Sequence, residues 1–173
     1  MASTKARAGT AHAAARVATS DLVGTWKLVA WEAVHPDGRV SHPLGPAPQG
    51  LVIYGADGWM SAAMSASGRR PLPVGRARAA PDAERARAFD SFLAYSCRWR
   101  LVDDTVLHEV VVALNPAMVG TRQLRRVALS GRTLVVSTED RVADGVRRHR
   151  LRLRRVAPTA ASRRASGKEG GER

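Results

Sequence analysis

The stretch that decides the fold lies near the middle of the chain and reads YSCRWRLVDDTVLHEVVVAL, residues 95–114. It contains two runs rich in β-branched and aromatic residues, 95–102 and 105–114, separated by Asp103-Asp104. Runs of this composition are typical of β-strands. A two-residue connection is too short for a parallel crossover, so the two runs are predicted to form an antiparallel hairpin.

Outward from this hairpin, strand-like runs and short turns repeat along the chain. The other runs are 22–34, 49–55, 59–65, 120–129, 132–138 and 146–156. Turn-forming residues separate most of them, for example His35-Pro36-Asp37-Gly38 and Ser130-Gly131. About eight strands with such short connections predict an all-β fold, an antiparallel up-and-down β-barrel that closes on itself and leaves a cavity. A β-sandwich is the alternative.

One segment interrupts the strand pattern. Residues 66–80 are rich in glycine, proline and arginine without periodicity, which predicts a long loop. Pro81 and the acidic residues that follow it favour the start of a helix. Apolar side chains then recur at helical spacing, at Ala86, Phe89, Phe92 and Leu93. We expect one helix over residues 81–93 that packs on the barrel and ends near Tyr95.

The length of 173 residues fits one domain, expected at residues 21–157. Residues 1–20 contain no acidic residue and no apolar core, so we interpret them as a disordered tail rather than a secretory or transit peptide. Residues 158–173 are predicted to be a second disordered tail. No apolar run is long enough to span a membrane as a helix.

Cysteine, histidine and charge content narrow the classes of function. Cys97 is the single cysteine and cannot form an internal disulfide, which favours a cytoplasmic location. The five histidines lack the spacing of metal ligands, so we expect neither a metal nor another cofactor. The net charge of +13 comes almost entirely from arginine and is not interleaved with aromatic residues, so we expect at most weak, non-specific nucleic-acid binding.

The first predicted strand contains Gly24-Thr25-Trp26, which resembles the G-x-W signature of lipocalins. The wider text resembles a bacterial and fungal lipocalin-like domain family over about residues 21–157, on the segments 22–26, 43–45, 50–54, 57–62, 95–99 and 115–123. The resemblance implies a calycin-type barrel in which Trp26 plugs the base and Arg155 packs across its ring. Two positions depart from the family pattern, with Glu109 in place of a second histidine and Met118 in place of a tryptophan.

Period-two alternation predicts which side chains face the barrel interior. The predicted inward sets are Val106, His108, Val110, Val112 and Leu114; Tyr95, Cys97, Trp99 and Leu101; and Gln123, Arg125, Val127 and Leu129. For the last strand of the three, the opposite face with Arg122, Leu124 and Arg126 is the alternative. The arginines at 148, 150, 152 and 154 share one face of the closing strand and are predicted to lie on the outer surface.

His108 and Arg125 are the most informative residues on these faces. His108 among aliphatic side chains is either a core histidine bonded to a backbone carbonyl or a polar anchor for a ligand. An inward Arg125 needs a partner, and no acidic residue falls clearly on an inward face, Glu109 being on the wrong side of its strand. We therefore expect a carboxylate, enolate or phenolate group of a ligand beside Arg125.

The candidate ligand-binding residues are Tyr54, Met60, Tyr95, Trp99, His108, Gln123 and Arg125. The leading hypothesis is a barrel that binds a small apolar or weakly acidic organic molecule, as a monomer or homodimer without a membrane or specific nucleic-acid partner. Similar barrels in natural-product pathways include cofactor-free cyclases and isomerases, so the resemblance implies a second hypothesis. In such an enzyme His108 would be the catalytic base and Arg125 would stabilise an oxyanion. The third is a partner-binding module that uses the basic surface.

Overall fold

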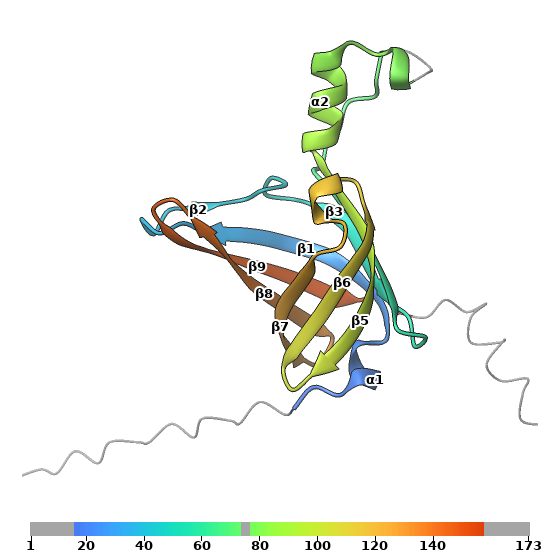
Figure 1. Cartoon of the computed structure of the whole chain (residues 1–173), viewed down its shortest axis with the longest axis vertical. Helices are drawn as coiled ribbons and strands as arrows, with labels where there is room; N and C mark the ends of the chain where they lie inside the picture. Colours follow the sequence, from blue (N-terminus) through green and yellow to red (C-terminus); the bar gives the residue numbers. More distant parts are fainter. Residues whose placement is uncertain (1–15, 74–76, 158–173) are drawn as a thin grey trace, which may run out of the picture.

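A computed structural model describes residues 16–73 and 77–157 and shows a closed antiparallel β-barrel (Figure 1). The strands of the described residues are β1 Gly24–Val34, β2 Val40–Ser41, β3 Gln49–Tyr54, β4 Trp59–Ser65, β5 Phe92–Val102, β6 Thr105–Ala113, β7 Arg122–Ser130, β8 Thr133–Val142 and β9 Gly145–Arg155. The α-helices are α1 Thr19–Leu22 and α2 Asp82–Asp90, and short 3-10 turns lie at Ala77–Ala79 and Pro116–Met118. Within these residues no helix is both long and apolar enough to cross a membrane.

The barrel closes through β1, which has a different neighbour on each side. Its first residues pair with β3, from Gly24 opposite Tyr54 to Lys27 opposite Leu51. On its other side it pairs with β9, from Trp26 opposite Arg155 to Val34 opposite Arg148. The remaining long strands pair in chain order, and β2 adds a short edge to β1. The predicted up-and-down barrel is confirmed, and the sandwich alternative is wrong.

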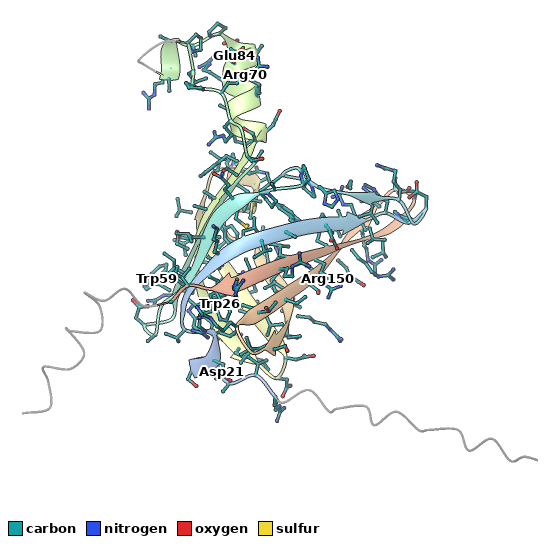
Figure 2. The ribbon with its side chains drawn as sticks, turned by 180° about the vertical axis from the view of Figure 1, so that it is seen from behind. Asp21, Trp26, Trp59, Arg70, Glu84 and Arg150 are labelled. Atoms are coloured by element: carbon teal, nitrogen blue, oxygen red, sulfur yellow. The ribbon has the colours of Figure 1, made fainter. Side chains whose placement is uncertain are left out.

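The narrow end of the barrel is closed by Trp26, which is fully buried (Figure 2). Its indole N–H donates to the carbonyl of Leu22 at 2.8 Å, and the guanidinium carbon of Arg155 lies 4.2 Å from its ring centroid. Arg155 also donates to the carbonyls of Val23 and Asp21. A Cβ at Gly24, where φ is +129°, would lie 3.0 Å from this guanidinium. The closure that the resemblance implied is therefore present.

The inward faces predicted for β5, β6 and β7 follow the expected alternation, except at a bulge between β5 and β6. Cys97, Val106 and Val110 are buried as expected, and the arginine stripe of β9 is exposed. Between β5 and β6 the register shifts, since Ser96 pairs with Val112 while Cys97 pairs with Val110. The extra residue reverses the alternation beyond Val110. The prediction that Val112 and Leu114 face inward is therefore wrong, and Val112 is 58% exposed.

Helix α2 differs from the expected helix in its end and its packing. It ends at Asp90 and projects beyond the barrel rim, with no buried residue and with Phe89 exposed (Figure 1). Phe92 and Leu93 belong to β5, where they pair with Ser65 and Met64 of β4. These two residues cannot complete an apolar helical face because strand pairing already uses them. The expectation of a helix that packs along the barrel wall is wrong.

The predicted tails lie mostly outside the described residues. Residues 1–15 and 158–173 are not described, so their predicted disorder stays a prediction. Residues 16–20 are described, and they belong to the folded domain: Val17 packs against the core, and Thr19 begins α1. The folded part thus starts a few residues before the expected boundary at residue 21.

Candidate ligand-binding site

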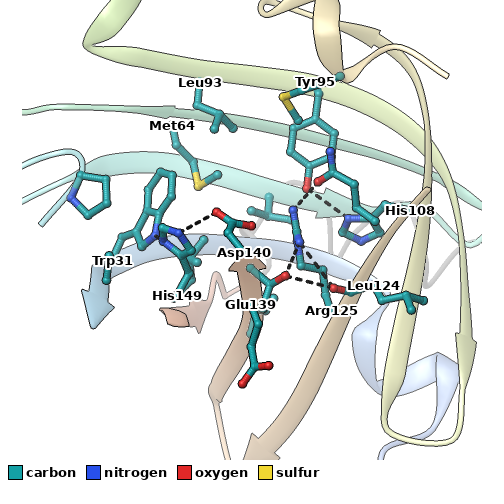
Figure 3. Close-up of a pocket in the computed structure, with 18 of the residues that line it drawn as sticks. Trp31, Met64, Leu93, Tyr95, His108, Leu124, Arg125, Glu139, Asp140 and His149 are labelled. Carbon is teal, nitrogen blue, oxygen red and sulfur yellow. Dashed lines mark hydrogen bonds and ion pairs between the residues drawn. The ribbon is translucent and has the colours of Figure 1, made fainter. Parts of the chain in front are cut away.

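The barrel interior contains a cavity of about 960 Å³, whose lining includes Pro43, Asn115 and Met118 between the strands but not Trp26. Figure 3 draws part of this lining, with His108 and Arg125 among the labelled residues. Its apolar wall comes from β3, β4, β5, β8 and β9 and includes Val52, Met64, Leu93, Val136, Leu151 and Leu153. The cavity also reaches a gap in the wall, because β7 pairs with β8 only from Arg126 opposite Ser137 onward. Arg122 and Leu124 of β7 and Thr138 and Glu139 of β8 line the cavity along this gap.

His108 is the centre of a polar cluster deep in the cavity. It is 2% exposed, and each ring nitrogen faces a tyrosine hydroxyl. The Nε2 atom lies 3.2 Å from the Tyr54 hydroxyl, and Nδ1 lies 3.1 Å from the Tyr95 hydroxyl. Trp99 packs edge-on against the Tyr54 ring at 4.8 Å between centroids and donates its indole N–H to the Gly55 carbonyl. The cluster is thus built from side chains of three strands and supported by the Trp99 ring.

Burial keeps this cluster uncharged. Desolvation, with a smaller contribution from the nearby Arg125 charge, lowers the pKa of His108 to about 3. Desolvation also raises the pKa of Tyr95 to about 12, against the opposing effect of Arg125, and raises the pKa of Tyr54. At neutral pH His108 is a neutral imidazole, and both phenols keep their protons.

Arg125 lies at the edge of the same cluster, with its guanidinium held by neutral groups. It donates to the Thr138 hydroxyl at 2.6 Å, to the side-chain oxygen of Gln123 and, at 3.4 Å, to the Leu124 carbonyl. Among residues 16–73 and 77–157, no carboxylate lies within ion-pair distance of it. The prediction that Gln123 and Arg125 face inward is confirmed, whereas Leu124 is exposed and reaches the cavity only along the gap between β7 and β8.

A second polar cluster lies at the cavity mouth, around His149 of β9. The Trp31 indole N–H donates to His149 Nδ1 at 3.1 Å, so Nδ1 is the unprotonated nitrogen and Nε2–H donates to Asp140 at 3.0 Å. Arg147 pairs with the same carboxylate at 3.2 Å. Burial lowers the pKa of His149, while the Asp140 charge acts in the opposite direction.

This mouth cluster was not predicted from the sequence. His149 lies on the face of β9 opposite the arginine stripe, and its partners lie on other strands. Asp140 was missed because the strand was expected to end at Thr138, whereas β8 continues to Val142. The expectation that no acidic residue faces inward is therefore wrong, since Asp140 lines the cavity.

The structure brings five of the seven predicted binding residues to one cavity: Tyr54, Tyr95, His108, Gln123 and Arg125. Met60 and Trp99 are buried in the core but do not line the cavity. Met64 lines it instead, because it lies on the same face of β4 but farther from the turn to β3. Whether these residues bind a ligand stays a prediction.

Comparison with known families identifies one match. The family model of the lipocalin-like domain matches residues 23–156, which is most of the chain and includes all strands of the barrel. Neither a search of curated proteins nor a search of solved structures found a match. Barrels of this fold generally bind small hydrophobic ligands in their interior. The match and the closed barrel together show that the chain belongs to the lipocalin-like domain family.

Proposed function

We propose that this protein binds a small, largely apolar organic molecule inside the barrel. The observation that carries the proposal is the cavity of about 960 Å³, whose apolar wall surrounds a compact polar cluster at depth and a second one at the mouth. An apolar pocket with a few convergent polar groups is the usual form of a small-molecule site. Such a ligand would contact Val136 and Met64 on the wall and reach the tyrosine hydroxyls at depth.

A matched pair of variants on β8 tests this proposal. Val136 is buried and lines the cavity, whereas Val135 lies on the other face of the same strand. Val136→Trp places a bulky side chain in the cavity and is expected to weaken binding of the neutral fluorescent probe N-phenyl-1-naphthylamine by at least about tenfold, a loss near 1.4 kcal/mol. Val135→Trp should bind as wild type does. Equal binding by both variants, or no binding by the wild type, would overturn the proposal.

The natural ligand can be sought in the purified protein itself. The protein is denatured, and the small molecules released are identified by mass spectrometry. Purification of Val136→Trp in parallel supplies the background of molecules that bind elsewhere. A compound enriched at near-stoichiometric amount in wild type and absent from Val136→Trp is the expected result.

The cyclase or isomerase hypothesis finds less support in the site. A general base works best with a pKa near the operating pH, and the pKa of His108 is about 3. Both of its nitrogens already face tyrosine hydroxyls.

A cytoplasmic location stays a prediction that rests on the lone Cys97.

A further inference from the structure

Tyr54, His108 and Tyr95 share three polar hydrogens between two hydrogen bonds. A neutral imidazole has one N–H and one lone pair. One tyrosine therefore donates its hydroxyl hydrogen to the ring, and the other accepts the ring N–H. In either tautomer, one hydroxyl hydrogen is left without an acceptor inside this trio. Both hydroxyls belong to residues that line the cavity, so the trio offers the cavity a hydrogen-bond donor.

Arg125 carries its positive charge beside this trio. Its three acceptors, on Gln123, Thr138 and Leu124, are all neutral. The Gln123 amide uses both of its ends in hydrogen bonds, because its nitrogen donates to the Thr121 hydroxyl while its oxygen accepts from Arg125. The charge of a half-buried guanidinium is thus balanced only by dipoles within the described residues, and a charged acceptor would bind it more strongly.

We propose that the cavity binds its ligand through an anionic oxygen, held between Arg125 and the uncommitted hydroxyl of the Tyr54–His108–Tyr95 trio. This inference rests on the proposed function and adds the chemical class of the ligand: a mostly apolar molecule bearing a carboxylate, phenolate or enolate. A ligand that presents only donors, or a cation, would place its group against a donor hydrogen and a positive charge. The acidic group at the mouth, Asp140, already pairs with His149 and Arg147.

The ionisation state of a bound phenol tests this proposal directly. The probe is 4-nitrophenol, whose anion absorbs visible light and whose neutral form does not. Protein is titrated into the probe at a pH about one unit below the probe's own pKa, where roughly a tenth is ionised in water. Wild-type protein should bind the anion at least about tenfold more tightly than the phenol, so the visible band should grow on binding.

Two neighbouring arginines on β7 supply the variant and its control. Arg125→Leu removes the inward guanidinium, whereas Arg126→Leu removes the guanidinium of the next residue, which is exposed on the outer face. Both variants lose the same net charge. We expect Arg125→Leu to abolish the growth of the visible band and Arg126→Leu to retain it. Arg125→Gln serves the same purpose should Arg125→Leu fail to fold.

A second arm separates the possible sources of the anionic oxygen. Decanoate and decanol differ only in the polar group, and each is tested by displacement of N-phenyl-1-naphthylamine. A carboxylate site predicts that decanoate displaces the dye at a concentration at least about tenfold lower than decanol does, and that Arg125→Leu removes this difference. A phenolate or enolate site predicts the nitrophenol result without a preference for decanoate.

The outcomes distinguish this inference from the proposed function. Binding of N-phenyl-1-naphthylamine and decanol, with no preference for either anion, would overturn the inference and leave the apolar cavity as the ligand site. An anion preference that persists in Arg125→Leu and Arg125→Gln would also overturn it. Failure of every probe to bind would overturn both the inference and the proposed function.

Discussion

The two buried histidines of this barrel have opposite surroundings, although both line the same cavity. His108 lies deep, with a tyrosine hydroxyl on each ring nitrogen. His149 lies at the mouth, with an indole N–H on one nitrogen and a carboxylate on the other. The contrast shows that the depth of a histidine in the cavity determines which hydrogen-bond partners it can have. At depth the hydrogen-bond partners of the histidine are neutral hydroxyls, while near solvent a charged carboxylate is tolerated because water still screens it.

The largest expected difference between the two histidines is in acid. Because the pKa of His108 is about 3 in the folded protein against 6.5 in the unfolded chain, the unfolded chain takes up the proton first as pH falls. The free energy of unfolding therefore carries no penalty from His108 above pH 6.5. It decreases as the pH falls from 6.5 toward 3, by up to about 1.4 kcal/mol per pH unit. Urea unfolding at a series of pH values measures the slope.

The control for this acid effect compares the two sites. His108→Leu should remove most of the slope, whereas His149→Leu should remove less of it, because Asp140 partly compensates the burial of His149. The same slope in wild type and His108→Leu would contradict the assignment of a neutral, buried His108.

The next effect concerns neutral pH, where His108→Leu leaves two tyrosine hydroxyls without their partner. An unpaired buried hydroxyl costs about 1–3 kcal/mol, so for two hydroxyls we expect a loss of about 2–6 kcal/mol in the free energy of unfolding. The triple variant Tyr54→Phe/His108→Leu/Tyr95→Phe removes all three polar groups and should regain part of this loss. A triple variant less stable than His108→Leu would show that packing, not hydrogen bonding, dominates at this site.

At the mouth, Asp140→Asn is expected to have a smaller effect. The Asp140 side chain is about half exposed, so the loss of its charge should cost about 0.5–1 kcal/mol. The pKa of His149 should fall further in this variant, because the Asp140 charge no longer favours the imidazolium. Titration of the histidine resonances by NMR checks this, with His108 as the internal control that should not change. An unchanged pKa of His149 would show that the Asp140 charge does not influence the protonation of His149.

The smallest expected effect lies on the outer face of β6, next to His108. Glu109 pairs with Arg122 at 3.1 Å, and both side chains are exposed. Glu109→Gln should change the free energy of unfolding by less than about 0.5 kcal/mol, as is usual for a surface ion pair. A loss comparable to that of His108→Leu would mean that the two faces of β6 are energetically coupled.

Much of the site can be predicted from the sequence, and the reasons differ by residue. Tyr95, His108, Gln123 and Arg125 were placed inward by alternation alone, because each lies in a run that the structure keeps as a regular strand. Val112 was misplaced because a bulge between β5 and β6 reverses the alternation, and the sequence has no glycine there to indicate it. Asp140 was missed because β8 continues through residues with the composition of a loop, supported by its pairing with β9.

By itself, the sequence determined the number and order of the main strands, their antiparallel pairing and most of the inward faces. These properties are local, since alternation and turn chemistry depend on residues a few positions apart. Only the tertiary structure decided which side chains meet. Trp31 and His149 are 118 positions apart and contact each other because closure pairs β1 with β9, with a register shift between Leu28 and Ala30. The meeting of Tyr54 and Tyr95 at His108 depends likewise on the register of several strands around the barrel, which no short stretch of sequence specifies.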